Sequence, residues 1–170
     1  MAKQRTPTSI EFFGHLKWLD GRPLLDVIEP YRRELFTKAL DTCGEGGAPA
    51  YSLVLAGRGK KNWKSADLVF AALFCLVIRR SVYGNDAFIL ANDEQQAGDD
   101  LGLAKKLVAC NPDLDAEIEV LAKELRLKDG SGSLKILPAK DVLGAHGKSA
   151  GFVGFDEIHG YRDWNLLEAL

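Results

Sequence analysis

Apolar residues in this chain fall into short runs that glycine, proline and charged residues separate, which favours an α/β fold. The run YSLVLA at 51–56 is short and contains Val and an aromatic residue, so it predicts a buried strand. ADLVFAALFCLVIRR at 66–80 is too long and too rich in Ala and Leu for a strand and predicts a buried helix. A glycine-bearing turn joins the two. The rest of the chain is arranged around this strand, loop and helix.

The same pattern predicts further strands downstream. AFILA at 87–91 is a second apolar run and predicts a strand. ELRLK and SLKILPA alternate on either side of Asp129-Gly130, which predicts a β-hairpin. FVGF at 152–155 predicts another buried strand, and Ala139–Gly151 before it predicts a loop with a short helical turn.

Two helices are predicted between the strands. Residues 92–110 have an apolar face and begin with acids, so we expect a helix capped by Asn92 or Asp93. LDAEIEVLAKEL at 114–125 predicts a second, short amphipathic helix. The sequence thus predicts one sheet with helices between its strands.

Residues 9–40 precede this core and contain a helix that Pro30 is expected to start. Tyr31 and Arg32 lie in its first turn. They either contact a nucleotide base, or Tyr31 packs and Arg32 is solvated, and the local pattern favours the second. The glycine-rich link CGEGGAPA follows, so we place an N-terminal adapter segment at 1–50 and the α/β core at 51–170.

Composition and charge narrow the class of protein. The 170 residues are 46% hydrophobic and 27% charged, as in a globular domain with a real core. A net charge of −2 argues against a protein that coats nucleic acid, although a local basic patch remains open. Three widely spaced cysteines predict reduced thiols. The polar N-terminus and the short longest apolar run, 68–78, predict a soluble intracellular protein.

The loop between the first strand and its helix carries Gly57, Gly59 and the pair Lys64-Ser65. Backbone N–H groups at a helix N-terminus attract phosphate, so this context predicts a phosphate-binding loop. Lys64 would reach the terminal phosphates, and the Ser65 hydroxyl would contact magnesium. Trp63 stands where glycine is expected and would adopt a left-handed backbone at a cost of about 1–2 kcal/mol. The alternative is a basic surface turn before a core helix.

The last predicted strand runs straight into Asp156-Glu157. Acids at the carboxyl end of such a strand lie where α/β folds bind ligands. Asp156 would orient magnesium, and Glu157 would polarise an attacking water. The alternative is that an acidic pair after an apolar run belongs to an ordinary core or turn.

In order and spacing, four segments resemble the N-terminal ATPase domain of the large terminase subunit of tailed bacteriophages, from about residue 28 to 170. The segments are IEPYRREL, with Arg32 where the family usually has Gln; GKKNWKS, with Trp63 for glycine; FILANDEQQA, with Gln96-Ala97 on the family's Gln-Ala; and VGFDEIHGYRDWNLLEAL.

The resemblance implies a P-loop NTPase of the RecA-like or ASCE type, with a mostly parallel sheet flanked by helices. It also implies that the chain is incomplete at its C-terminus and lacks the family's nuclease domain. The implied function is ATP hydrolysis with Mg²⁺, which drives double-stranded DNA into a capsid. The implied partners are the small terminase subunit, the portal protein and further copies in a ring, in the cytoplasm of a bacterial host, without a membrane.

The resemblance and the loop chemistry together assign roles to residues. The expected catalytic residues are Glu157, Lys64 and, for charge stabilisation, Lys60. The expected magnesium ligands are Ser65 and Asp156. The expected nucleotide-binding residues are Gly59, Lys61, Asn62, Trp63, Lys64, Ser65, Tyr31 and Arg32.

Two rival interpretations stay open. The first is a helicase-like P-loop ATPase of another branch, which motifs beyond the acidic strand would distinguish. The second is an inactive truncated remnant that folds, binds no nucleotide and acts only as a protein-interaction module.

Overall fold

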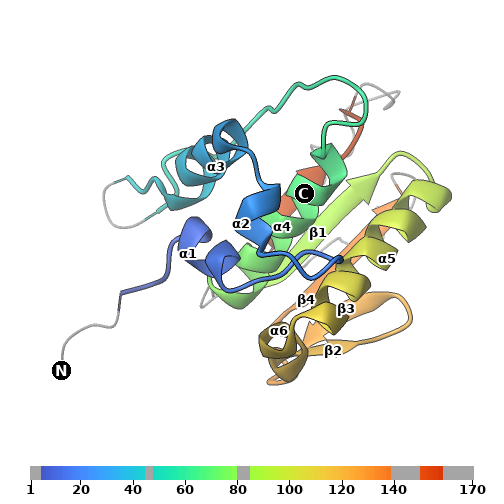
Figure 1. Ribbon diagram of the computed structural model, residues 1–170. Coiled ribbons are helices and arrows are strands. Elements are labelled where there is room, and N and C mark those ends of the chain that lie inside the picture. The colour runs from blue at the N-terminus through green and yellow to red at the C-terminus, as the bar shows by residue number, and fades with distance from the viewer. Residues whose placement is uncertain (1–4, 45–47, 80–84, 139–149, 159–170) are drawn as a thin grey trace. The chain divides into compact units, whose positions relative to one another are not determined.

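The computed structural model describes residues 5–44, 48–79, 85–138 and 150–158 (Figure 1). The chain divides into two compact units, Met1–Asn62 and Trp63–Leu170. The predicted domain boundary after residue 50 stays a prediction. In the described part of the chain, no helix is long and apolar enough to cross a membrane.

Unit 1 is helical. Its elements are α1 (Ser9–Gly14), α2 (Leu24–Val27), α3 (Pro30–Phe36) and the π-helical turn η1 (Thr37–Asp41). Thr8 and Glu11 form a capping box that starts α1, and Pro30 starts α3 as predicted. The rings of Phe13 and Phe36 pack edge to face with centroids 4.9 Å apart, so α1 and α3 share an aromatic core.

The segment 51–56 is not the buried strand that its apolar run predicts. It has no strand structure, and Tyr51, Leu53, Val54 and Leu55 are all exposed, Leu55 to 75%. A strand forms only where another strand satisfies its backbone N–H and C=O groups. No such partner pairs with this segment among the described residues, so the prediction was wrong.

Unit 2 contains a five-stranded sheet with the order β2-β3-β4-β1-β5. Its strands are β1 (Asp86–Ala91), β2 (Ile118–Val120), β3 (Glu124–Leu127), β4 (Ser133–Pro138) and β5 (Ala150–Phe155). The predicted strands at 87–91 and 152–155 are confirmed, but of residues 152–155, predicted to be buried, only Gly154 is buried. β1 pairs in parallel with both β4 and β5, whereas β3 pairs antiparallel with β4 and β2. The α/β class is therefore confirmed, in a mixed sheet whose parallel part is β4-β1-β5.

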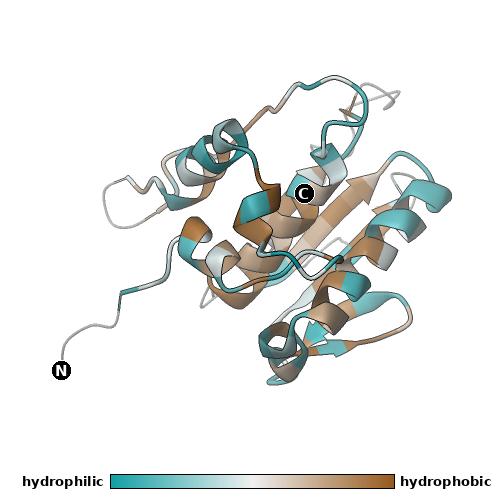
Figure 2. Cartoon of the chain, in the orientation of Figure 1, coloured by the Kyte–Doolittle hydropathy of each residue, from teal (hydrophilic) through white to brown (hydrophobic). Residues whose placement is uncertain are grey.

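Two long helices, α4 (Lys64–Val77) and α5 (Glu94–Cys110), pack against the sheet and against each other. Figure 2 shows α4 and β1 mostly in apolar colours, whereas α5 has both apolar and polar residues. This agrees with burial, because α4 is nearly all buried after its first turn, whereas α5 buries Ala97, Ala104 and Leu107 on one face. Asp93 caps α5, as predicted, by accepting from Gln96 N at 2.8 Å.

The predicted hairpin is confirmed, because β3 and β4 pair around Asp129-Gly130. The predicted helix at 114–125 is wrong over most of its length. Only α6 (Pro112–Glu117) is helical, and Ile118–Val120 form β2 against β3. The β-branched Ile118 and Val120 complete this edge, so pairing overrides the local helical pattern. The loop predicted at 139–151 lies mostly outside the described residues.

Candidate functional site

The first component of the candidate site is the start of α4. Lys64 begins this helix, and Trp63 precedes it with φ 58° and ψ 17°, a left-handed backbone. The predicted left-handed conformation of Trp63 is therefore confirmed. The side chain of Trp63, the residue that precedes the helix, makes no capping hydrogen bond to α4. The helix start thus leaves backbone donors for an anion next to Lys64 and Ser65.

Asp156 is the second component and lies at the end of β5, where its N–H donates to Leu90 O of β1 at 2.9 Å. Its carboxylate is buried, with the residue only 2% exposed. Ser65 Oγ donates to Asp156 Oδ2, and Gln96 Nε2 donates to the same oxygen at 2.8 Å. The Glu157 N–H donates to Asp156 Oδ1 at 2.9 Å. Three donors, from Ser65 of α4, from Gln96 of α5 and from the backbone of Glu157, therefore hold the Asp156 carboxylate in place.

Glu157 is the third component and pairs with the lysine of α4. Lys64 Nζ lies 3.0 Å from Glu157 Oε1, and both side chains are partly buried, at 23% and 29% exposure. Glu157 has φ 53°, a left-handed backbone that is costly for a residue with a side chain. Backbone strain of this kind clusters at functional sites. The structure therefore brings together four of the predicted residues: Lys64, Ser65, Asp156 and Glu157.

Asp100 is a residue of this region that sequence reasoning missed. It lies one helical turn after Gln96 on α5, is 5% exposed, and its buried Oδ2 has no hydrogen-bond partner among the described residues. Burial, the charge of Asp156 and that of Asp99 raise the pKa of Asp100 to about 7. The signal in the sequence was its i+4 spacing from Gln96, which puts both side chains on one helix face.

The other predicted site residues belong to unit 1. Gly59, Lys60, Lys61 and Asn62 are exposed, and Lys61 has φ 62°. Arg58 Nη1 donates to Asn62 O at 3.2 Å in this loop. The nucleotide and catalytic roles of these loop residues remain predictions.

The burial of Tyr31 and Arg32 is the opposite of what their local sequence pattern favours. Tyr31 is 50% exposed, so it is not a buried core residue, and Arg32 is fully buried, so it is not solvated. Arg32 Nη1 donates to Val27 O at 3.2 Å and to Glu29 Oε2 at 2.7 Å. A buried guanidinium needs such partners, and here the turn before α3 supplies them. The described contacts give Arg32 a structural role, and its contact with a nucleotide base stays a prediction.

The residues at the start of α4 and after β5 fit a magnesium-bound phosphate. Mg²⁺ prefers one or two carboxylates and keeps several waters, which suits the hydroxyl of Ser65 beside Asp156. Lys64 and the α4 N-terminus supply positive charge for phosphate. No group of three or more His, Cys, Asp or Glu residues suited to a metal occurs within the described ranges. A cation here would therefore depend on water or phosphate for its remaining ligands.

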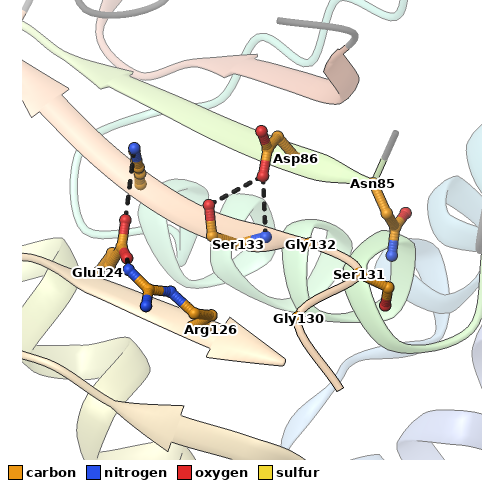
Figure 3. A pocket seen from close by; sticks show the side chains of 9 residues that line it. Asn85, Asp86, Glu124, Arg126, Gly130, Ser131, Gly132 and Ser133 are labelled. Carbon is orange, nitrogen blue, oxygen red and sulfur yellow. Dashed lines mark hydrogen bonds and ion pairs between the residues drawn. The ribbon is translucent and has the colours of Figure 1, made fainter. Parts of the chain in front are cut away.

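A hollow of about 300 Å³ lies in unit 2 near the starts of β1 and β4 (Figure 3). Its polar groups satisfy one another, because Asp86 Oδ1 accepts from the backbone and hydroxyl of Ser133 at 3.0 and 2.9 Å. Glu124 pairs with Arg126 and with Lys135. Because β1, β4 and β5 are parallel, the starts of β1 and β4 lie at the opposite end of the strands from Asp156, which follows β5. The hollow is therefore not part of the candidate site.

Fold and site together define an α/β protein with a mixed five-stranded sheet, in which the Lys64-Ser65 helix start lies against the acidic pair that follows β5. The chain is similar in structure to the large terminase of bacteriophage HK97, with a TM-score of 0.66 and 16% sequence identity. The match covers 90% of this chain and 38% of that terminase chain, and it confirms the terminase-like fold that the sequence motifs indicate. No family model matches the chain. No curated protein matches its sequence.

Proposed function

We propose that this chain is the ATPase part of a phage DNA-packaging motor, which hydrolyses ATP with Mg²⁺ to drive double-stranded DNA into a capsid. In this proposal the whole motor contains a ring of copies on a portal protein, a small terminase subunit and DNA, and works in the host cytoplasm. The similarity to the HK97 large terminase supports this context.

One observation carries the ATPase proposal. Residues far apart in sequence, Lys64-Ser65 and Asp156-Glu157, meet through a hydroxyl–carboxylate hydrogen bond and an ion pair of 3.0 Å. An ordinary surface turn before a core helix gives no reason for Asp156 to be buried against Ser65. A site that needs a lysine, a hydroxyl and two acids within reach of one phosphate group does give a reason.

Each side chain then has a separate task. Lys64 and the N–H groups at the start of α4 bind phosphate oxygens, and Ser65 with Asp156 holds the cation. Bound magnesium supplies charge that neutralises the developing negative charge on the phosphoryl group. Lys64 must leave Glu157 to reach phosphate. Glu157 is then released to accept a hydrogen bond from the attacking water and orient it.

The first test is calorimetric binding of Mg-ATP to the chain and to Lys64→Ala. We expect Lys64→Ala to weaken binding by at least about tenfold, since a charge-assisted hydrogen bond is worth about 1.5–3 kcal/mol. Lys106→Ala is the matched control, because Lys106 is an exposed lysine of α5 outside the site, and it should bind as the unmodified chain does. Absence of binding in a folded, unmodified chain would reject the ATPase proposal and support the interaction-module alternative.

A second variant, Glu157→Gln, separates binding from hydrolysis. It removes the carboxylate that competes with phosphate for Lys64, so Mg-ATP should bind at least as tightly as before. Phosphate release should fall by about 10²–10⁴-fold, the usual contribution of a positioned base. Unchanged hydrolysis in Glu157→Gln would remove Glu157 from the catalytic set.

A further inference from the structure

The side chain of Asp100 on α5 needs a physical explanation. Aspartate is rarely buried without a partner, yet Asp100 is 5% exposed and its Oδ2 accepts no hydrogen bond among the described residues. A buried polar atom without a partner costs about 1–3 kcal/mol, and more when it is charged. Such an atom in a folded protein indicates a strained, catalytic or ligand-binding group.

The face of α5 that carries Asp100 meets Asp156 through Gln96. Gln96 lies four residues earlier on the same face of α5, and its Nε2 is 2.8 Å from Asp156 Oδ2. Asp156 is also close enough for its charge to raise the pKa of Asp100. Two buried carboxylates, Asp100 on α5 and Asp156 after β5, therefore lie near each other, and the hydroxyl of Ser65 binds the second of them.

The described residues do not neutralise this pair of acids. The nearby Lys64 forms its ion pair with Glu157. Asp156 receives hydrogen bonds from Ser65, Gln96 and Glu157 N–H, which are all neutral donors. Neither Asp100 nor Asp156 forms an ion pair in the described part of the chain. Two buried negative charges without a counter-ion strongly favour a bound cation.

We propose that Asp100 is a second carboxylate ligand, with Asp156, of a divalent-cation site between α5 and β5. The proposal deepens the proposed function and rests on it in one respect, because Asp156 belongs to both. Two carboxylates and a hydroxyl suit Mg²⁺ or Mn²⁺, which complete their shells with water. The cation is therefore held by α5 as well as by the acidic strand, and binding does not require a nucleotide.

The test measures Mn²⁺ binding to the nucleotide-free chain at pH 8 by the electron paramagnetic resonance signal of free Mn²⁺. Asp100→Asn keeps the shape of the side chain and removes its charge, and should weaken Mn²⁺ binding by about tenfold or more. Asp99→Asn is the matched control, since Asp99 is the adjacent and exposed aspartate of α5. It removes the same charge and should change the affinity less than twofold.

Two further measurements keep the outcomes distinct. Thermal unfolding in EDTA should show Asp100→Asn at least as stable as the unmodified chain, so that lost Mn²⁺ binding is not lost folding. Equal Mn²⁺ affinity in Asp100→Asn and Asp99→Asn overturns the proposal, whether or not Mg-ATP binds. If Mg-ATP does not bind but Asp100→Asn still weakens Mn²⁺ binding, the cation site stands and the ATPase proposal fails.

Discussion

Two residues of the candidate site, Trp63 and Glu157, have left-handed backbones at φ 58° and 53°. L-residues adopt this region at a cost of about 1–2 kcal/mol each, because Cβ approaches the following carbonyl oxygen. One strained residue, Trp63, directly precedes Lys64, and the other, Glu157, is the ion-pair partner of Lys64. Among the described non-glycine residues of unit 2, Trp63 and Glu157 are the two with a positive φ, and backbone strain of this kind clusters at functional sites.

The backbone of Trp63 gives a prediction that separates strain from side-chain packing. Trp63→Gly and Trp63→Ala both remove the indole, but only Ala keeps a Cβ in the left-handed region. Glycine loses about 0.5–1 kcal/mol through its freer unfolded state. We therefore expect Trp63→Gly to be more stable than Trp63→Ala by about 0.5–1 kcal/mol in urea unfolding. Greater stability of the alanine variant would show that the loop relaxes out of the left-handed conformation.

Asp100 gives a prediction about pH. Its pKa is about 7 in the folded chain against an ordinary value of 3.8, because of burial and the charges of Asp156 and Asp99. Between about pH 4 and pH 7 the folded state therefore holds a proton that the unfolded state releases. Stability from this group is fully present below about pH 4 and is lost as pH rises through about 7.

Asp100→Asn should remove this dependence on pH. In EDTA, the variant and the unmodified chain should have similar melting temperatures near pH 4. The variant should become the more stable of the two by pH 8, by a few kcal/mol at most, since one pKa unit corresponds to about 1.4 kcal/mol. Asp99→Asn should follow the unmodified chain closely. A constant difference between Asp100→Asn and the unmodified chain across this range would contradict the raised pKa.

At the residue scale, sequence predicted what depends on local rules. The left-handed Trp63 follows from a bulky residue at a glycine position, and the Asp93 cap follows from helix-start chemistry. The environments of Tyr31 and Arg32 were predicted in reverse, because burial of Arg32 depends on acceptors at Val27 and Glu29. Nothing in a linear pattern reports that such acceptors converge in space.

At the element scale, β5 lies directly against α4. A Cβ at Gly154 would come within 2.7 Å of Leu68 Cδ2 and 3.1 Å of Phe152 Cε1. Gly154 therefore allows the close contact that aligns Asp156 with Ser65 at the start of α4. The position of the candidate site therefore depends on the contact between α4 and the C-terminal end of β5.

Gly154→Ala should lower the free energy of unfolding by about 1–3 kcal/mol, since the added methyl group overpacks this contact. Gly98→Ala on α5 is the control, because no atom lies within 4 Å of an added Cβ there. Gly98→Ala should raise stability by about 0.5–1 kcal/mol through helix propensity. Urea unfolding of both variants measures the difference, and a neutral Gly154→Ala would mean that Leu68 moves aside freely.

Helices and strands with a strong local sequence pattern were predicted correctly, whereas those that depend on pairing with a distant strand were not. α4, α5, β1 and the β3–β4 hairpin have strong local patterns and were predicted. The predictions for 51–56 and 118–120 were wrong in opposite ways: a strand was predicted at 51–56 and none forms, whereas a helix was predicted at 118–120 and a strand forms. Each has a pattern that a strand or helix could satisfy, and the outcome depends on whether another strand pairs with it. Pairing is a long-range property and leaves no local signal.

At the scale of the whole molecule, the chain spans 38% of the HK97 terminase chain that it matches. Its sheet ends on one side at β5, which pairs with β1 and, within the described residues, with no other strand. The sequence of β5, AGFVGF, has no charge and no proline to protect that edge. The opposite edge, β2, is short and carries Glu119.

The edge of β5, which pairs with no second strand within the described residues, predicts self-association that a single charge should reduce. Val153 lies on the face opposite Gly154, because side chains alternate along a strand, so Val153→Lys places a charge on the edge without adding atoms under α4. Light scattering after size exclusion should show that the unmodified chain forms larger species as its concentration rises, and that Val153→Lys does so much less. Val120→Lys, on the 42% exposed position of β2, adds the same charge to the protected edge and should leave association unchanged. Equal concentration dependence in both variants and the unmodified chain would place the association surface elsewhere. A selective effect of Val153→Lys would show that β5 is the edge where this sheet accepts a further strand.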